Sequence, residues 1–197
     1  MINLVELVKT NWKAISLFIV TAIIAPYSLY GLYQDHIKQE ETKSQIDSFL
    51  RNADSLLETT DYEDAIGEYK DVLKQISLQG NPVEYGRTQN NLGNAYYKFS
   101  DVQDKEENLN KAIQAFEEAL KIFTIQNDPI DYAITKNNLG TTFNDLSGIR
   151  DKEENLNKAI QAFEEALKIR TIEKYPLDYA TTKTALEASL RAANRTT

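Results

Sequence analysis

Two pairs of adjacent asparagines are the residues in this 197-residue chain best suited to recognise another molecule. Asn90-Asn91 and Asn137-Asn138 lie 47 positions apart. Each side-chain amide offers a donor and an acceptor, so it can pair with the backbone of an extended peptide. The alternative is a structural role, in which the amides bond between neighbouring segments. Both roles stay open for Asn90 and Asn137, whereas the structural role is favoured for Asn91 and Asn138.

Catalytic chemistry has no such candidates. The chain contains no Cys and a single His, His36, which excludes thiolate sites and His-rich metal centres. Motifs for phosphate binding, zinc proteolysis and a nucleophile elbow are absent from the sequence. The acids at 104–108 and 151–155 match no EF-hand spacing and are expected to complement helix dipoles. We therefore expect no enzyme activity, no cofactor and no metal site. The formal charge of −8 also makes nucleic acid an unsuitable partner.

An internal repeat must position the asparagines. The segment DKEENLNKAIQAFEEALKI occurs at 104–122 and again, unchanged, at 151–169. The match extends backward at a constant offset of 47, which makes Pro82, Pro129 and Pro176 equivalent. Each copy predicts two helices. The first begins at the proline, a favoured first helical position, and the second carries the apolar face of the duplicated segment.

Glycines and caps add detail to these predicted helices. Gly93 and Gly140 fall in the middle of the first helix of their repeats, where Gly is less favourable than Ala by up to about 1 kcal/mol. Their presence predicts a close approach of the paired helix. Asn81 and Asp128 precede the prolines and are predicted N-caps.

These patterns resemble tetratricopeptide repeats. The signature of that family appears here as Leu92-Gly93, Tyr96, Ala112, Phe116, Ala119 and Pro129, and it recurs 47 residues later. The later copies exceed the usual length of about 34 residues. About seven extra residues, around 104–110, are expected between the two helices, which resembles the extended, kinesin-light-chain-like branch. The resemblance implies an all-α fold, a right-handed solenoid of helix pairs over residues 45–197. Its repeats are expected at about 45–80, 82–128 and 129–175, with a capping helix at 176–194.

The resemblance also implies a binding groove. In this family the first helix of each repeat lines the concave surface, and in kinesin-light-chain-like repeats such asparagines hold peptide ligands. The face opposite Leu92 and Tyr96 then carries the predicted protein-binding residues: Arg87, Asn90, Asn94, Tyr97, Asn137, Thr141 and Asn144. Replacing Asn90 and Asn137 together with Ala is expected to weaken partner binding by about 1–3 kcal/mol while stability holds or rises.

A second feature precedes the repeats. Residues 14–33 carry no charge, and a helix of that length spans roughly 30 Å, the thickness of a bilayer core. The segment is therefore predicted to be a transmembrane anchor, with an interfacial belt formed by Trp12, Tyr27, Tyr30 and Tyr33. A cleaved signal peptide fits poorly, because the site Ile23-Ile24-Ala25 has a large residue at −3 and is followed by Pro26. A buried core helix of this length would be unusual in so small a domain.

Flanking charges give the expected orientation. Lysines number two on each side of the segment, and the α-amino group adds a charge to the tail, so the N-terminus is placed inside. The expected order is a tail at 1–13, the membrane helix at 14–33, a polar helical stalk at 34–44, and repeats on the non-cytoplasmic side. The predicted function is a single-pass membrane scaffold or assembly factor that binds another protein. The alternative is an accessory subunit of a larger membrane complex, docked without groove recognition.

Overall fold

The computed structural model describes residues 25–194, which contain α-helices and no strand. The described residues fall into two units, 25–48 and 49–194. Their helices are α3 (Ala25–Glu58), α4 (Tyr62–Gln75), α5 (Pro82–Phe99), α6 (Lys105–Ala119), α7 (Pro129–Ser147), α8 (Lys152–Leu167) and α9 (Pro176–Asn194). The predicted all-α class is therefore confirmed for this part of the chain.

The first unit consists of the N-terminal part of α3. Only residues 25–33 of this helix belong to the apolar run, and polar and charged residues follow from Gln34 onward. None of the helices within residues 25–194 combines the length and apolar character needed to cross a membrane. This finding contradicts the predicted single-pass membrane localisation, with its repeats on the non-cytoplasmic side, and it gives no support to the bilayer as a partner.

The residues predicted to form the interfacial belt are only partly described. Trp12 and residues 14–24 lie outside the described residues, as does the side chain of Tyr27. Tyr30 and Tyr33 are exposed side chains of α3. Their predicted role as membrane anchors depends on the predicted span, which the described helices do not support.

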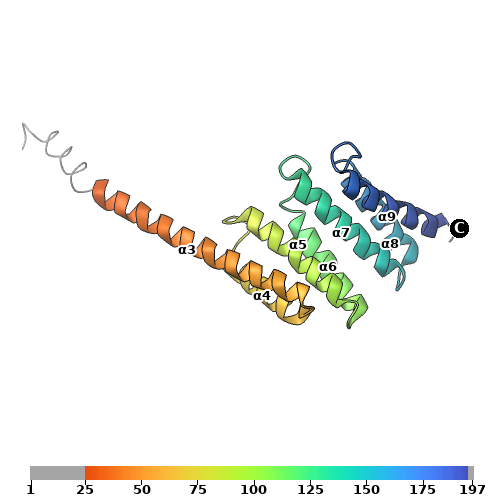
Figure 1. The fold of residues 1–197 in the computed structure, drawn as a ribbon, viewed down its shortest axis with the longest axis horizontal. Coiled ribbons are helices and arrows are strands. Elements are labelled where there is room, and N and C mark those ends of the chain that lie inside the picture. The colour runs from red at the N-terminus through yellow and green to blue at the C-terminus, as the bar shows by residue number, and fades with distance from the viewer. Residues whose placement is uncertain (1–24, 195–197) are drawn as a thin grey trace, which may run out of the picture. The chain divides into compact units, whose positions relative to one another are not determined.

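In the second unit, each helix from α4 onward packs against the next along the chain. The helices that begin at Pro82, Pro129 and Pro176 also contact one another, α5 with α7 and α7 with α9 (Figure 1). The unit thus places the first helix of one repeat beside the first helix of the next. One continuous apolar core runs through these pairs and includes the fully buried rings of Tyr69, Phe116 and Phe163.

At each of the two mid-helix glycines an aromatic ring of the paired helix lies against the backbone. A Cβ atom on Gly93 would lie 2.6 Å from Cε1 of Phe116, and one on Gly140 would lie 2.8 Å from Cε1 of Phe163. Real Cβ atoms do not approach other atoms so closely, so glycine is required for the aromatic ring to lie against the backbone of the first helix. The predicted reason for these glycines is confirmed.

The turn that leads into the second helix differs from the prediction. Because α6 begins at Lys105, residues 104–110 are not a connection between helices; most of them form the first turns of α6. Asp104 adopts a left-handed conformation with φ of 46°, and the buried amide of Asn108 donates a hydrogen bond of 2.9 Å to the carbonyl of Gln103. The second copy repeats this arrangement with Asp151, Asn155 and Arg150. A shared structural role therefore accounts for part of the duplicated sequence.

The predicted N-caps are also corrected. Asn81 and Asp128 occupy the N-cap positions of α5 and α7, but neither side chain makes a capping hydrogen bond. In each helix a proline takes the following position, where its missing N–H removes one of the donors that a cap would serve.

Candidate functional site

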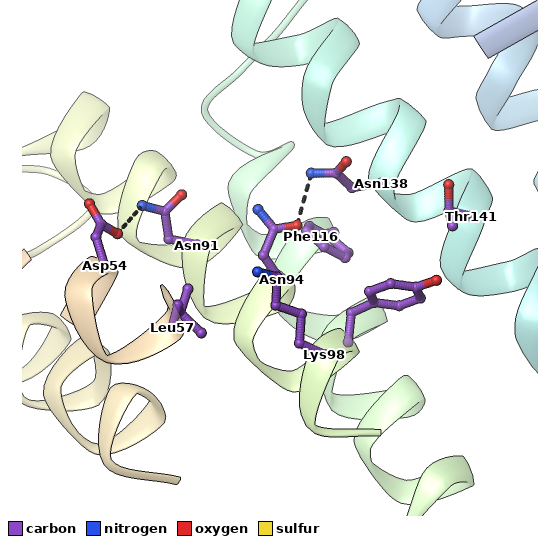
Figure 2. Close-up of a pocket in the computed structure, with 9 residues that line it drawn as sticks. Asp54, Leu57, Asn91, Asn94, Lys98, Phe116, Asn138 and Thr141 are labelled. Carbon is purple, nitrogen blue, oxygen red and sulfur yellow. Dashed lines mark hydrogen bonds between the residues drawn. The ribbon is translucent and has the colours of Figure 1, made fainter. Parts of the chain in front are cut away.

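A pocket of about 410 Å³ crosses the first helices of neighbouring repeats (Figure 2). It is lined by Asp54 and Leu57 of α3, by Asn91, Asn94, Tyr97 and Lys98 of α5, by Phe116 of α6, and by Asn138 and Thr141 of α7. We call it the amide pocket, because three asparagine side chains from two helices meet there. Its members all belong to the second unit, residues 49–194.

Helical periodicity brings these residues together. Asn91, Asn94 and Lys98 are spaced three and four positions apart, so they share one face of α5. Asn138 and Thr141 hold the positions on α7 that are equivalent to Asn91 and Asn94, 47 residues later. The contact between α5 and α7 then sets these two faces side by side.

Hydrogen bonds fix the amides in place. Nδ2 of Asn138 donates to Oδ1 of Asn94 at 3.0 Å, across the two repeats, and Nδ2 of Asn91 donates to Asp54 at 3.3 Å (Figure 2). Within the described residues, Nδ2 of Asn94 and Oδ1 of Asn138 have no protein partner. One donor and one acceptor therefore remain free in the pocket for a ligand.

Asn90, Asn137 and Asn144 occupy a different position, where they join neighbouring first helices. Their Oδ1 atoms accept hydrogen bonds of 3.2, 2.9 and 2.9 Å from the hydroxyls of Thr135, Thr182 and Ser189, respectively. All three hydroxyl-bearing residues are fully buried. These hydrogen bonds join neighbouring repeats, which is the structural role considered above for the asparagines. A role of Asn90, Asn137 and Asn144 in partner binding stays a prediction.

The predicted binding residues therefore divide into groups. Asn94, Tyr97 and Thr141 line the amide pocket. Arg87 and Asn90 line a second pocket of about 340 Å³, where Arg87 forms an ion pair of 3.4 Å with Asp131. Asn137 and Asn144 are held in the contacts between repeats described above.

Sequence reasoning missed several residues of the amide pocket. The predicted face of the first helix ran through positions 87, 90, 94 and 97, whereas the face that lines the pocket runs through Asn91, Asn94 and Lys98. For Asn91 and Asn138 the sequence favoured a structural role. The i, i+3, i+7 spacing of Asn91, Asn94 and Lys98 was the available signal. No spacing in the sequence linked the other lining residues Asp54, Leu57 and Phe116 to this face, because they come from other helices.

The chemistry available in the amide pocket is hydrogen bonding and apolar contact. Asp54, the lining carboxylate, already accepts hydrogen bonds from the Tyr69 hydroxyl and from Asn91. Lys98 is exposed at the pocket edge. Across residues 25–194, no group of three or more acidic or His side chains is placed to hold a metal ion. The arrangement suits recognition of a polar backbone.

Three tyrosines tie helices together through carboxylates. The hydroxyl of Tyr69 donates to Asp54, that of Tyr97 to Asp145 at 2.8 Å, and that of Tyr132 to Glu165 at 2.9 Å. Burial is the main cause that raises the pKa of each hydroxyl above its ordinary value of 10.0, and the bonded carboxylate raises it further. The pKa of Tyr132 reaches about 12.

These tyrosines predict a loss of stability in alkali. A raised folded-state pKa means that the unfolded chain releases the hydroxyl proton first, so stability is intact below about pH 10 and falls as the pH rises further. We expect the urea midpoint of unfolding to drop between about pH 10 and pH 12, and to drop less in the Tyr69→Phe variant. The exposed Tyr33 supplies the control substitution, Tyr33→Phe, which should leave the alkaline loss unchanged. An equal loss in Tyr69→Phe and the original chain would contradict this account.

The comparisons with known proteins agree with the helix pairs. Residues 88–123 and 141–171 match the tetratricopeptide repeat model. These two segments are therefore detected as tetratricopeptide repeats, and the predicted helical-repeat architecture is confirmed. The finer assignment to a kinesin-light-chain-like type has no support from this match. A comparison with curated proteins found no match.

Proposed function

We propose that residues 49–194 form a protein-interaction module whose amide pocket holds an extended segment of a partner. The observation that carries this proposal is the free donor at Asn94 Nδ2 beside the free acceptor at Asn138 Oδ1. An extended residue presents its own N–H and C=O on the same side of the chain, so a single residue of a partner can satisfy both atoms. Tetratricopeptide repeats are protein-interaction scaffolds, which agrees with this reading.

The other lining residues define which partner segments fit. Leu57 supplies apolar surface beside the buried ring of Phe116, and Tyr97 supplies an aromatic wall whose hydroxyl is held by Asp145. Lys98 adds an exposed positive charge at the edge. We therefore expect a segment with an apolar side chain for the pocket and an acidic residue placed to meet Lys98.

The test is the double substitution Asn94→Ala with Asn138→Ala. Because these two amides bond each other, removing both leaves neither of them as an orphan, and the fold should persist. Peptides selected from a displayed random library with the original chain serve as the probe. By calorimetry, the double variant should bind the selected peptide about 10- to 100-fold more weakly, since hydrogen bonds to a desolvated partner are lost.

A matched control is an exposed side-chain amide that lies outside the amide pocket. Gln161 is exposed on α8 and lines none of the pockets described above, so Gln161→Ala should bind the same peptide with unchanged affinity. If the double variant folds and binds as tightly as the original chain, the module docks by another surface, as an accessory subunit would, and the proposal fails.

A further inference from the structure

Two equivalent positions in neighbouring repeats carry different side chains. Phe123 follows α6, and Arg170 follows α8 47 residues later. Phe123 is buried against Gly86, where a Cβ atom would lie 2.7 Å from the ring. At the place equivalent to Gly86, Ala133 has a Cβ atom, so the same packing of a phenylalanine is not available. The repeat at 82–128 has the apolar phenylalanine at this position, and the repeat at 129–175 has a guanidinium instead.

Arg170 is an unusual residue to find in the core. Its side chain is 9% exposed, and Nη1 donates one hydrogen bond of 2.9 Å to the hydroxyl of Thr182. No carboxylate within the described residues lies in ion-pair contact with it. Burial lowers the pKa of Arg170, and the more distant charge of Asp178 opposes that effect. A buried charge whose donors are largely unused is unfavourable unless a partner arrives.

Within the described residues, Asp178 also lacks the ion-pair partner that its equivalent has one repeat earlier. Its equivalent in the preceding repeat, Asp131, pairs with Arg87, but Ile134 stands where an arginine would meet Asp178. Arg170 and Asp178 both line a pocket of about 220 Å³ between α7, α9 and the connection that joins α8 to α9. The remaining walls are Ile130, Ala133, Ile134, Ile169 and Tyr175. We call this the α9 pocket; it combines two opposite charges with an apolar wall.

We propose that the α9 pocket binds a free aliphatic α-amino acid. The carboxylate would meet Arg170, the ammonium group would meet Asp178, and the side chain would lie against Ile134 and its neighbours. A simple carboxylate would be repelled by Asp178 and a simple amine by Arg170, whereas a zwitterion satisfies both. A peptide terminus supplies only one of the two charges. The volume is also below the roughly 300–1,000 Å³ of pockets for drug-sized ligands, which fits a molecule of this size.

Calorimetry with the full chain tests the proposal, using L-leucine, leucinamide and N-acetyl-leucine as probes. Leucinamide lacks the carboxylate and N-acetyl-leucine lacks the ammonium group. We expect leucine to bind and each analogue to bind at least about tenfold more weakly. The variant Arg170→Gln should lose leucine binding. Absence of leucine binding to the folded original chain, or equal binding of all three compounds, would overturn the proposal.

A second variant keeps the test decisive if Arg170→Gln fails to fold. Asp178 is exposed, so Asp178→Asn should fold normally and should narrow or reverse the preference for leucine over N-acetyl-leucine. An unchanged preference in Asp178→Asn would overturn the assignment. The Asn94→Ala, Asn138→Ala double variant should bind leucine normally, because the α9 pocket shares no residue with the amide pocket. Failure of one proposal is therefore distinguishable from failure of the other.

Discussion

Replacing Gly93 with alanine should lower the free energy of unfolding by about 1–3 kcal/mol, although alanine is intrinsically the better helix former by about 1 kcal/mol. The new Cβ atom would lie 2.6 Å from the ring of Phe116, which is fully buried in the apolar core. Either the ring must leave its position or α5 and α6 must separate. Urea denaturation, read as a change in midpoint, measures the effect.

The chain supplies a matched control for this substitution. Gly67 lies in the middle of α4, and a Cβ atom there would have no neighbour within 4 Å. Gly67→Ala should therefore stabilise the protein by up to about 1 kcal/mol, with the opposite sign to Gly93→Ala. Gly140→Ala should behave like Gly93→Ala, because its Cβ atom would lie 2.8 Å from Phe163. If all three substitutions stabilise the fold, the close approach of paired helices is wrong.

The second large effect is expected at Asn137. Its Oδ1 atom accepts the hydroxyl of Thr182, which is fully buried and itself accepts a hydrogen bond from Arg170. Asn137→Ala removes this acceptor and leaves a buried hydroxyl without one, which should destabilise the fold by about 1–3 kcal/mol, offset by a few tenths for helix propensity. The sequence alone led us to expect that stability would hold or rise. The midpoint of urea unfolding decides between the two expectations.

Asn90 provides the comparison, because it holds the equivalent position one repeat earlier. The hydroxyl of Thr135 lies 3.2 Å from Asn90 Oδ1, but it also lies 2.8 Å from the carbonyl oxygen of Asp131. Thr135 therefore keeps an acceptor when Asn90 is replaced, and Asn90→Ala should destabilise the fold less than Asn137→Ala. Equal losses in the two variants would show that these hydroxyl contacts do not set the stability.

Much of the fold was predictable because its signals are local or repeated. Each proline at the start of a 47-residue copy marks the start of a helix, and the structure begins α5, α7 and α9 at Pro82, Pro129 and Pro176. A glycine in mid-helix has few local justifications, so Gly93 correctly indicated a close neighbour. Apolar residues at helical spacing identified Phe116 as part of the core.

The site was less predictable because its roles depend on partners from other helices. Asn90 and Asn91 are adjacent in the sequence, yet one bonds a buried hydroxyl of the next repeat and the other lines the amide pocket. Only the packing of α5 on α7 separates these roles. The left-handed conformation of Asp104 and the burial of Arg170 likewise arise from tertiary contacts that no local pattern encodes.

The predicted membrane span failed for a different reason. It rested on the uncharged run alone, and within the described residues that run continues into a helix whose later turns are polar. Length and hydropathy of a segment do not by themselves define the helix to which it belongs.

Nuclear magnetic resonance of the side-chain amides tests the central claim most directly, which is that the amide pocket receives a partner's backbone. Titration with a library-selected peptide should shift the Nδ2 signal of Asn94 and the amide signals of Asn138. Asn157, which is exposed on α8, serves as the internal control and should not move. Shifts confined to Asn157 and other side chains outside the pocket, with Asn94 and Asn138 unchanged at saturation, would contradict the account.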